Sequence, residues 1–243
     1  MPRTNEETRI IEKYQKRDER LPWNDWRTNI YHQRHPVGHL FQEHNHDILV
    51  SALNELDLGL AGLRILDIGC GYGSWLRYLV ELGADSPNCV GVDLSQHRLG
   101  IAKQKNPAIS WCRENVAQLS FPDGFFDLVL QSVVFSSILD AQMRMSCALE
   151  MCRITRQGGI IFWIDLVQAS SPSLVTFSEV EVRNYFPGLS IVYRERVHPA
   201  YFRRLNGRYA CLAKSIYQLT KYGCESQLLV FRKSLKSTKN MGS

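Results

Sequence analysis

The sequence contains no apolar run of about 18 or more residues, the length that a membrane-spanning helix needs. Its first twenty residues are charged and polar, unlike a secretory signal peptide. The seven cysteines include no Cys-x-x-Cys pair, and their odd number argues against a full set of disulfides and against a structural zinc site. We therefore expect a cytoplasmic protein with reduced thiols, no membrane span and no bound metal.

The composition is that of a globular protein. Of 243 residues, 44% are hydrophobic, enough for one substantial core with a small appended cap. The net charge of +5 is uneven, because eleven Lys and Arg residues and two acidic residues lie between Arg194 and the C-terminus. That quarter suits an anionic partner. We expect a helical arm or cap at 1–40, a main domain at 41–233 and a disordered tail at 234–243.

The most informative stretch is Ile65–Gly73, which reads Ile-Leu-Asp-Ile-Gly-Cys-Gly-Tyr-Gly. Its apolar first half is typical of a strand buried on both faces of a parallel sheet. Three alternate glycines follow, directly before Ser74–Leu82, which we expect to be helical. A glycine-rich turn into a helix N-terminus leaves backbone N–H groups free for a ligand, so the pattern predicts a nucleotide site.

The spacing distinguishes between nucleotide ligands. It does not match Gly-x-Gly-x-x-Gly, because Ser74 takes the sixth position. Asp67 lies two residues before the first glycine, where a carboxylate suits a ligand with an ammonium and a sulfonium better than a pyrophosphate. The stretch resembles motif I of the class I S-adenosylmethionine (SAM)-dependent methyltransferases. Trp75 is a candidate for the methionine end of the cofactor or for core packing. The resemblance assigns to the cofactor Asp67, Gly69, Cys70, Gly71 and Gly73.

From Arg64 to Leu166 the pattern alternates between strand and helix, as in a doubly wound α/β sheet. The resemblance implies a seven-stranded, mostly parallel sheet with an antiparallel last strand, for which Ser226–Arg232 is our candidate. Residues 1–20 are expected to form a loosely docked helix or a frayed arm as part of an N-terminal helical cap. The other predicted strands are Arg64–Ile68, Cys89–Asp93, Ile109–Arg113, Phe126–Gln131, Ile160–Leu166 and Ile191–Val197, and the other predicted helices are Phe41–Leu58, Asp140–Ile154, Phe177–Tyr185 and Tyr201–Leu219.

Asp93 ends the second predicted strand, where a carboxylate can accept both ribose hydroxyls of an adenosine. Its ordinary alternative is the N-cap of the next helix. The resemblance extends to Arg113–Gly124, which is similar to the family's acidic loop after strand 3. It implies that Asn115 receives the adenine amino group, that Val116 offers a backbone N–H to the ring, and that Leu94 also contacts the cofactor.

Phe126–Gln131 and the residues after it resemble the family's fourth strand and its exit, where the methyl group and the acceptor usually meet. The resemblance makes Gln131 and Ser132 cofactor contacts and makes Phe135 an acceptor contact. These matches, in the right order along the chain, cover about residues 44–166.

Five of the seven histidines lie within residues 32–46. Because histidine is the natural base at neutral pH, we expect His39 or His44 to remove the proton of a hydroxyl acceptor, the alternative being ordinary surface or packing histidines. Trp26 and Tyr31 are candidates for stacking on a sugar or ring acceptor, with a packing seam as their alternative. The acid-rich motif of metal-dependent O-methyltransferases is missing.

The resemblance predicts a SAM-dependent methyltransferase of the small-molecule, biosynthetic type, acting on a hydroxyl of a sugar, a glycan precursor or a secondary metabolite. One alternative is an RNA methyltransferase, because aromatic residues are interleaved with the basic C-terminal quarter. Against it, no Asn/Asp-Pro-Pro-Tyr/Phe motif follows the fourth predicted strand. A second alternative is a SAM-binding regulatory subunit without catalysis, since cofactor residues do not establish turnover.

Overall fold

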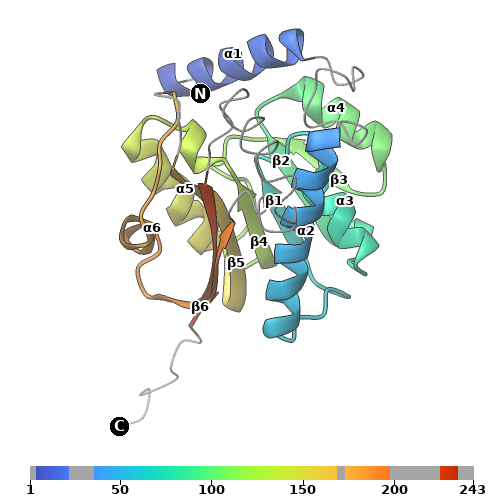
Figure 1. Ribbon diagram of the computed structural model, residues 1–243, viewed down its shortest axis with the longest axis vertical. Coiled ribbons are helices and arrows are strands. Elements are labelled where there is room, and N and C mark those ends of the chain that lie inside the picture. The colour runs from blue at the N-terminus through green and yellow to red at the C-terminus, as the bar shows by residue number, and fades with distance from the viewer. Residues whose placement is uncertain (1–3, 22–35, 169–172, 198–224, 235–243) are drawn as a thin grey trace, which may run out of the picture.

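A central sheet is flanked by helices on both faces, and a further helix, α1, lies across one end of it (Figure 1). None of the described helices is long and apolar enough to cross a membrane. The predicted helix at Tyr201–Leu219 and the predicted tail beyond Ser234 lie outside the described residues. The computed structural model describes residues 4–21, 36–168, 173–197 and 225–234, with the backbone alone at 36–45, 168, 197 and 225.

The described residues form one seven-stranded sheet in the order β3-β2-β1-β4-β5-β7-β6. Strands β1 to β5 pair in parallel, whereas β7 is antiparallel to both β5 and β6. This topology confirms the predicted fold class, and β7 is the predicted antiparallel last strand. The strands are β1 Ile65–Ile68, β2 Cys89–Asp93, β3 Ser110–Arg113, β4 Phe126–Ser132, β5 Thr155–Gln168, β6 Leu189–Val197 and β7 Glu225–Lys233.

The sheet separates two apolar cores because alternate strand residues face opposite sides. In β1, Ile65 packs with α2 and α3, whereas Leu66 and Ile68 pack with α5 and α6. Four buried residues in a row therefore make β1 a central strand, as its apolar sequence predicts. The helices are α1 Asn5–Arg20, α2 Pro36–Glu55, α3 Ser74–Glu81, α4 Gln96–Lys105, α5 Ala141–Ile154 and α6 Glu179–Tyr185, with short 3-10 turns η1 at Ser86–Asn88 and η2 at Phe135–Ser137.

Helix α2 begins and ends earlier than the predicted Phe41–Leu58. It begins at Pro36, a residue that fits the first helical turn because its missing N–H has no partner there. It ends at Glu55 because the N–H of Leu58 donates to the carbonyl of Leu53 at 2.9 Å and Asp57 adopts a φ of 48°. This left-handed cap stops the helix.

Two further boundaries differ from prediction. Strand β5 begins at Thr155 rather than at the predicted Ile160 and continues through Gly158 and Gly159, with a register shift opposite β4 that accommodates them. Helix α6 begins at Glu179, after a capping box in which Ser178 and Glu181 exchange hydrogen bonds. Capping side chains of this kind determine where a helix begins.

Helix α1 is docked, so of the two expectations for residues 1–20 the docked helix is confirmed and the frayed arm is wrong. Its N-terminus is capped by Thr4, whose hydroxyl oxygen accepts the N–H of Glu7 at 3.1 Å. Ile10 is 7% exposed and belongs to the core formed by α5 and α6. Burial of this side chain and the polar contacts described below attach the helix to the sheet.

Candidate functional site

The predicted cofactor residues of β1, β2 and β4 converge on the carboxyl edge of the sheet. Asp67 lies in β1 opposite Gly91 of β2, and Gln131 of β4 lies opposite the last residue of β1. Asp93 ends β2, and its Oδ2 accepts the N–H of Gly71 at 2.9 Å. In doubly wound sheets this edge is where ligands bind.

The glycine turn between β1 and α3 uses its glycines for different purposes. A Cβ added at Gly71 would meet nothing within 4 Å, so this part of the turn faces open space. A Cβ added at Gly73 would lie 2.2 Å from the ring of Trp111, so only glycine admits that ring. Cys70, between them in the turn, is buried, and burial raises the pKa of its thiol well above the ordinary value. A thiol held protonated in this way is a packing group rather than a nucleophile.

The two carboxylates of the site have different surroundings. Asp93 accepts two backbone N–H groups, from Gly71 at 2.9 Å and from Ser95 at 2.8 Å. Asp67 is 1% exposed, and its Oδ2 has no hydrogen-bond partner among the described residues. Burial, together with the charge of Asp93, raises the pKa of Asp67 well above its ordinary range. An orphaned buried carboxylate oxygen is costly and therefore needs an explanation.

The loop after β3 places the predicted adenine residues at the same edge. Asn115 accepts the N–H of Ala117 at 2.9 Å, and its amide donates to Glu7 of α1 at 3.4 Å. Val116 is 9% exposed, and Leu94 packs against the core to which Val116 belongs. The loop thus keeps a defined shape and is in contact with α1. Its role in binding adenine stays a prediction.

At the exit of β4, two of the predicted site residues, Gln131 and Phe135, are fully buried. The amide of Gln131 is fully buried, donating to the carbonyl of Ile164 at 3.2 Å and accepting the N–H of Val134 at 3.1 Å. Phe135 is fully buried and its ring contacts Trp163 edge to face at 6.2 Å between centroids. Ser132 at the end of β4 is partly exposed. Their predicted contacts with cofactor and acceptor stay predictions, and in this conformation Phe135 is part of the core.

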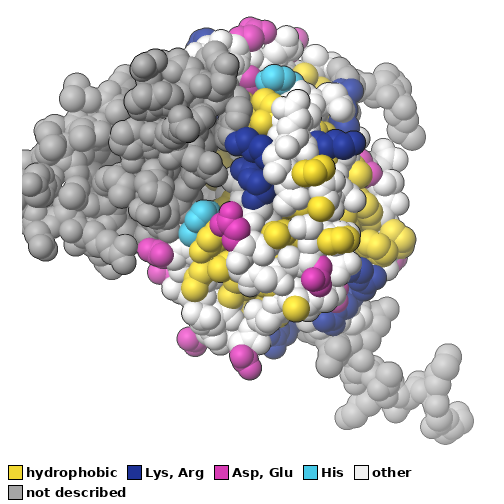
Figure 2. All heavy atoms as spheres, turned by 90° about the vertical axis from the view of Figure 1, so that its right-hand side faces the viewer, with side chains coloured by type: hydrophobic (Ala, Val, Ile, Leu, Met, Phe, Trp, Pro, Cys, Tyr) yellow, Lys and Arg dark blue, Asp and Glu magenta, His cyan; other side chains and the backbone are white. Residues whose placement is uncertain are grey.

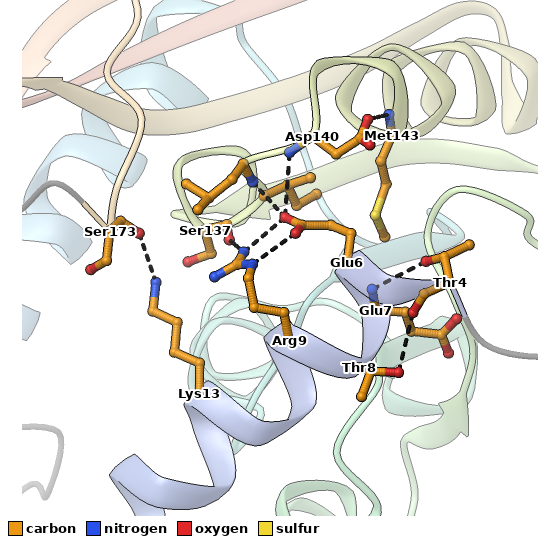
Figure 3. Close-up of polar contacts among 12 residues, drawn as sticks. Thr4, Glu6, Glu7, Thr8, Arg9, Lys13, Ser137, Asp140, Met143 and Ser173 are labelled. Carbon is orange, nitrogen blue, oxygen red and sulfur yellow. Dashed lines mark hydrogen bonds and ion pairs between the residues drawn. The ribbon is translucent and has the colours of Figure 1, made fainter.

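Helix α1 spans the carboxyl edge and joins the site from above (Figures 1 and 3). At one end, Glu6 accepts the N–H of Leu139 at 2.5 Å, and Arg9 donates to the carbonyl of Ser137 at 2.6 Å. Tyr14 shares a 2.6 Å hydrogen bond between hydroxyls with the same serine. The helix therefore lies over the exits of β3 and β4, as a cap on the predicted site.

The other end of α1 is held by an ion pair that the sequence analysis missed. Arg98, at 4% exposed, donates to both carboxylate oxygens of Asp18 at 2.7 and 2.5 Å. Its guanidinium also lies 4.4 Å from the ring centroid of Tyr14 and 5.2 Å from that of Tyr72. The partners are 80 positions apart, so no local pattern indicates the pair, although the spacing of Tyr14 and Asp18 is that of one helix face.

The predicted catalytic residues His39 and His44 lie where only the backbone is described, and Trp26 and Tyr31 lie outside the described residues. Their roles stay predictions. The neighbouring His46 stacks on Tyr78 of α3, with 3.4 Å between ring centroids, and meets Trp75 edge to face at 6.1 Å. Trp75 is therefore packed between α3 and α2, so core packing accounts for it. Its contact with the cofactor stays a prediction.

Comparison with known proteins agrees with this geometry. Residues 66–163 match the family model described as a methyltransferase domain. An uncharacterised methyltransferase of Synechocystis sp. is 34% identical over 110 residues, which are 45% of this chain and 50% of that protein. The ubiquinone biosynthesis O-methyltransferase of Rhizobium etli is 28% identical over 145 residues, 58% of this chain and 56% of that protein. The chain thus spans about half the length of these curated relatives.

A solved structure extends the likeness of fold to nearly the whole chain. The crystal structure of magnesium protoporphyrin IX methyltransferase from Synechocystis PCC 6803 with bound SAM has a TM-score of 0.65 and 17% identity, covering 96% of this chain and 100% of that one. At this identity the likeness concerns the fold. The matched segment 66–163 contains Asp67, the glycine turn and Asp93. Together with the sheet order, this match supports the resemblance to the class I SAM-dependent methyltransferases.

Proposed function

We propose that the chain binds SAM at the carboxyl edge of β1 and β2 and transfers its methyl group to a hydroxyl of a small-molecule acceptor. The observation that carries the proposal is the orphaned carboxylate oxygen of Asp67, buried beside a glycine turn that leaves open space at Gly71. A buried carboxylate of this kind favours a cationic ligand, because a positive charge removes the penalty of ionising it. SAM carries an ammonium and a sulfonium.

The residues around Asp67 fit the rest of such a ligand. Asp93 is proposed to accept the ribose hydroxyls, and its carboxylate already accepts the N–H of Gly71. Asn115 and Val116, in the loop after β3, are proposed to receive the adenine, and Glu7 of α1 contacts that loop. When bound, SAM supplies a methyl group on a sulfonium, which a nucleophile displaces in line. The protein aligns the two partners and excludes water from them.

An oxygen acceptor must also lose its proton. We propose His39 or His44 as the base, because an imidazole is half protonated near neutral pH and both residues belong to the N-terminal half of α2. Trp26 and Tyr31 are proposed to stack on the acceptor. The ubiquinone biosynthesis O-methyltransferase among the relatives supports a hydroxyl on a small ring compound as one acceptor class, beside sugars and other metabolites.

Isothermal titration of the protein with SAM, and separately with NAD, tests the cofactor. Asp67→Asn keeps the size of the side chain and removes its charge, so we expect SAM affinity to fall by about tenfold, or about 1.4 kcal/mol. The matched control is Asp127→Asn, which removes a strand carboxylate at the opposite end of β4. It should leave SAM affinity unchanged. A preference for NAD, or equal SAM affinity of Asp67→Asn and wild type, contradicts the proposal.

Incubation with methyl-labelled SAM and a panel of catechols, sugars and RNA tests the acceptor. Label in a catechol or sugar hydroxyl supports the proposal, whereas label in RNA replaces it with the nucleic-acid alternative. On the face over α3 and α4, basic side chains lie in small groups separated by apolar, acidic and uncharged surface (Figure 2). Such a surface is not the continuous basic track that RNA binding favours. Tight SAM binding with no transfer to any pool supports a non-catalytic subunit.

A further inference from the structure

Val133, directly after β4, has a backbone conformation that its side chain disfavours. Its φ is 58°, in the left-handed region that a β-branched residue rarely adopts. Its N–H donates to the carbonyl of Ile164 in β5 at 2.8 Å, which ties this conformation to the sheet. A residue persists in such a conformation when the surrounding structure over-determines it.

The buried side chain of Gln131 supplies one part of that constraint. Its amide nitrogen donates to the same carbonyl of Ile164 at 3.2 Å, and its amide oxygen accepts the N–H of Val134 at 3.1 Å. The amide thus bridges β5 and the residue after Val133, and it closes the turn on both sides. Both ends of the amide serve the backbone, so Gln131 shapes the turn rather than offering a free group to a ligand.

Asp165 of β5 supplies the second part. This fully buried carboxylate accepts the N–H of Ser136 at 3.2 Å and that of Leu166 at 2.9 Å. It therefore holds η2 to β5, two residues beyond the amide bridge of Gln131. Two buried polar side chains, from two strands, fix one short turn, which we call the exit turn, residues 131–137.

The exit turn touches both other parts of the site. A Cβ added at Gly69 would lie 2.5 Å from Cγ2 of Val134, so the exit turn is in close contact with the first glycine of the glycine turn. The carbonyl of Ser137, at its far end, accepts a hydrogen bond from Arg9 of α1 (Figure 3), and the Ser137 hydroxyl shares one with the hydroxyl of Tyr14. A change in the shape of the exit turn therefore reaches the glycine turn directly.

We propose that Gln131 is a positioning residue, which holds Val133 in its strained left-handed conformation and so presses Val134 against Gly69 to shape the cofactor side of the site. This inference rests on the proposed function. It adds that the buried amide of Gln131 balances the backbone strain at Val133. If the strain at Val133 is removed, the turn keeps its shape without the Gln131 amide. We therefore expect a substitution that relieves the strain at Val133 to restore the ligand affinity that a Gln131 variant loses.

The strain itself is tested by Val133→Asn and Val133→Thr, two polar substitutions of similar size. Asn tolerates the left-handed region, whereas Thr is β-branched like Val. In thermal unfolding we expect the Tm of Val133→Asn to exceed that of Val133→Thr by about 2–4 °C, the shift typical of a modest change in stability for a chain of this size. Equal Tm values for the two variants would show that Val133 is not strained, and they would overturn the proposal.

The positioning is tested by titrating S-adenosylhomocysteine into Gln131→Met, which keeps the side-chain length and removes the amide. We expect its Kd to rise at least about tenfold. In the double variant Gln131→Met with Val133→Asn, the Kd should return to within about threefold of wild type, because the turn no longer needs to be held. A double variant that binds as weakly as Gln131→Met overturns the proposal.

Val134→Ala provides a second route if Gln131→Met does not fold. It removes the contact with Gly69 and leaves the buried amide in place, and we expect about fivefold weaker binding of S-adenosylhomocysteine. An unchanged Kd overturns the proposal. If the wild type does not bind S-adenosylhomocysteine, the proposed function fails. If the wild type binds it but the double variant does not recover wild-type affinity, only this inference fails.

Discussion

Two turns leave neighbouring strands at the same edge of the sheet, and they are built in opposite ways. The glycine turn after β1 places glycine at its positive φ angles, and Asp67 beside it keeps a buried oxygen without a partner among the described residues. The exit turn after β4 places Val133 at a φ of 58°, and the polar side chains of Gln131 and Asp165 are engaged by backbone groups.

The difference indicates a ligand-binding role for the glycine turn and a positioning role for the exit turn. Unsatisfied buried groups favour a ligand that satisfies them, as we propose for Asp67 and SAM. Groups that already satisfy the backbone maintain a shape, as at the exit turn. Helix α1 contacts Ser137 of the exit turn and also Arg98 of α4, whose guanidinium lies 5.2 Å from the ring centroid of Tyr72 in the glycine turn, so it connects the two turns. The following experiments act on one turn at a time.

The largest effect is expected within the glycine turn. Gly73→Ala would place a Cβ 2.2 Å from the Trp111 ring at a φ of 72°, and we expect it to lower the free energy of unfolding by about 4 kcal/mol. Gly71→Ala, in open space at a φ of 55°, should cost only about 1 kcal/mol. Urea unfolding of both variants measures the difference. Equal losses would mean that Trp111 does not determine the need for glycine.

At the exit turn, we expect a pH dependence from Asp165. Burial raises the pKa of this carboxyl to about 6 from an ordinary value of 3.8. Between these values the folded protein binds more protons than the unfolded chain, so this group lowers stability as pH rises from about 4 to about 6, by about 3 kcal/mol in total. Above that range its contribution stays constant.

The comparison of wild type with Asp165→Asn isolates this effect from the other carboxylates. Urea unfolding between pH 4 and pH 7 should show the stability of wild type relative to the variant falling over the lower part of the range and then levelling. A difference that is independent of pH contradicts the raised pKa of Asp165.

The attachment of α1 should be stronger beside the glycine turn than beside the exit turn. Arg98→Met removes the buried partner of Asp18 and leaves it the 4.0 Å ion pair with Arg17, and we expect a loss of about 3 kcal/mol. Arg9 is more exposed, and Arg9→Met should cost about 1 kcal/mol. Unfolding gives both values, and limited proteolysis near residue 20 should be faster in Arg98→Met. Equal losses would show that α1 is held evenly along its length.

The smallest effect concerns the proton on Asp67. Because burial and Asp93 raise the pKa of Asp67, a cationic ligand that binds the ionised carboxylate displaces a proton at any pH below that pKa. We therefore expect SAM affinity to rise with pH below that pKa, by up to about tenfold per unit, or about 1.4 kcal/mol. Titrations in buffers of different ionisation enthalpy should detect the released proton. Asp67→Asn should abolish both the release and the pH dependence.

Most of the fold and the position of the site could be predicted from the sequence because their signals are local. The apolar run Ile65–Ile68 predicts a central strand, and the three glycines after it predict a turn that approaches a ligand. Asp93 at the end of β2 then lies at the same edge, because carboxyl ends of parallel strands meet there. The boundary of β5 was less predictable, because glycines that signal a turn were accommodated by a bulge in the ladder.

By itself, the sequence determined the alternation of strands and helices and the residues of the glycine turn, since apolar runs and glycine spacing act within a few positions along the chain. Only the tertiary structure decided that α1 is docked, since Asp18 and Arg98 are 80 positions apart. It also decided that Gln131 and Asp165 serve the backbone and that Val133 is left-handed. These properties depend on contacts between residues that are far apart in the sequence, and no local sequence pattern predicts such contacts.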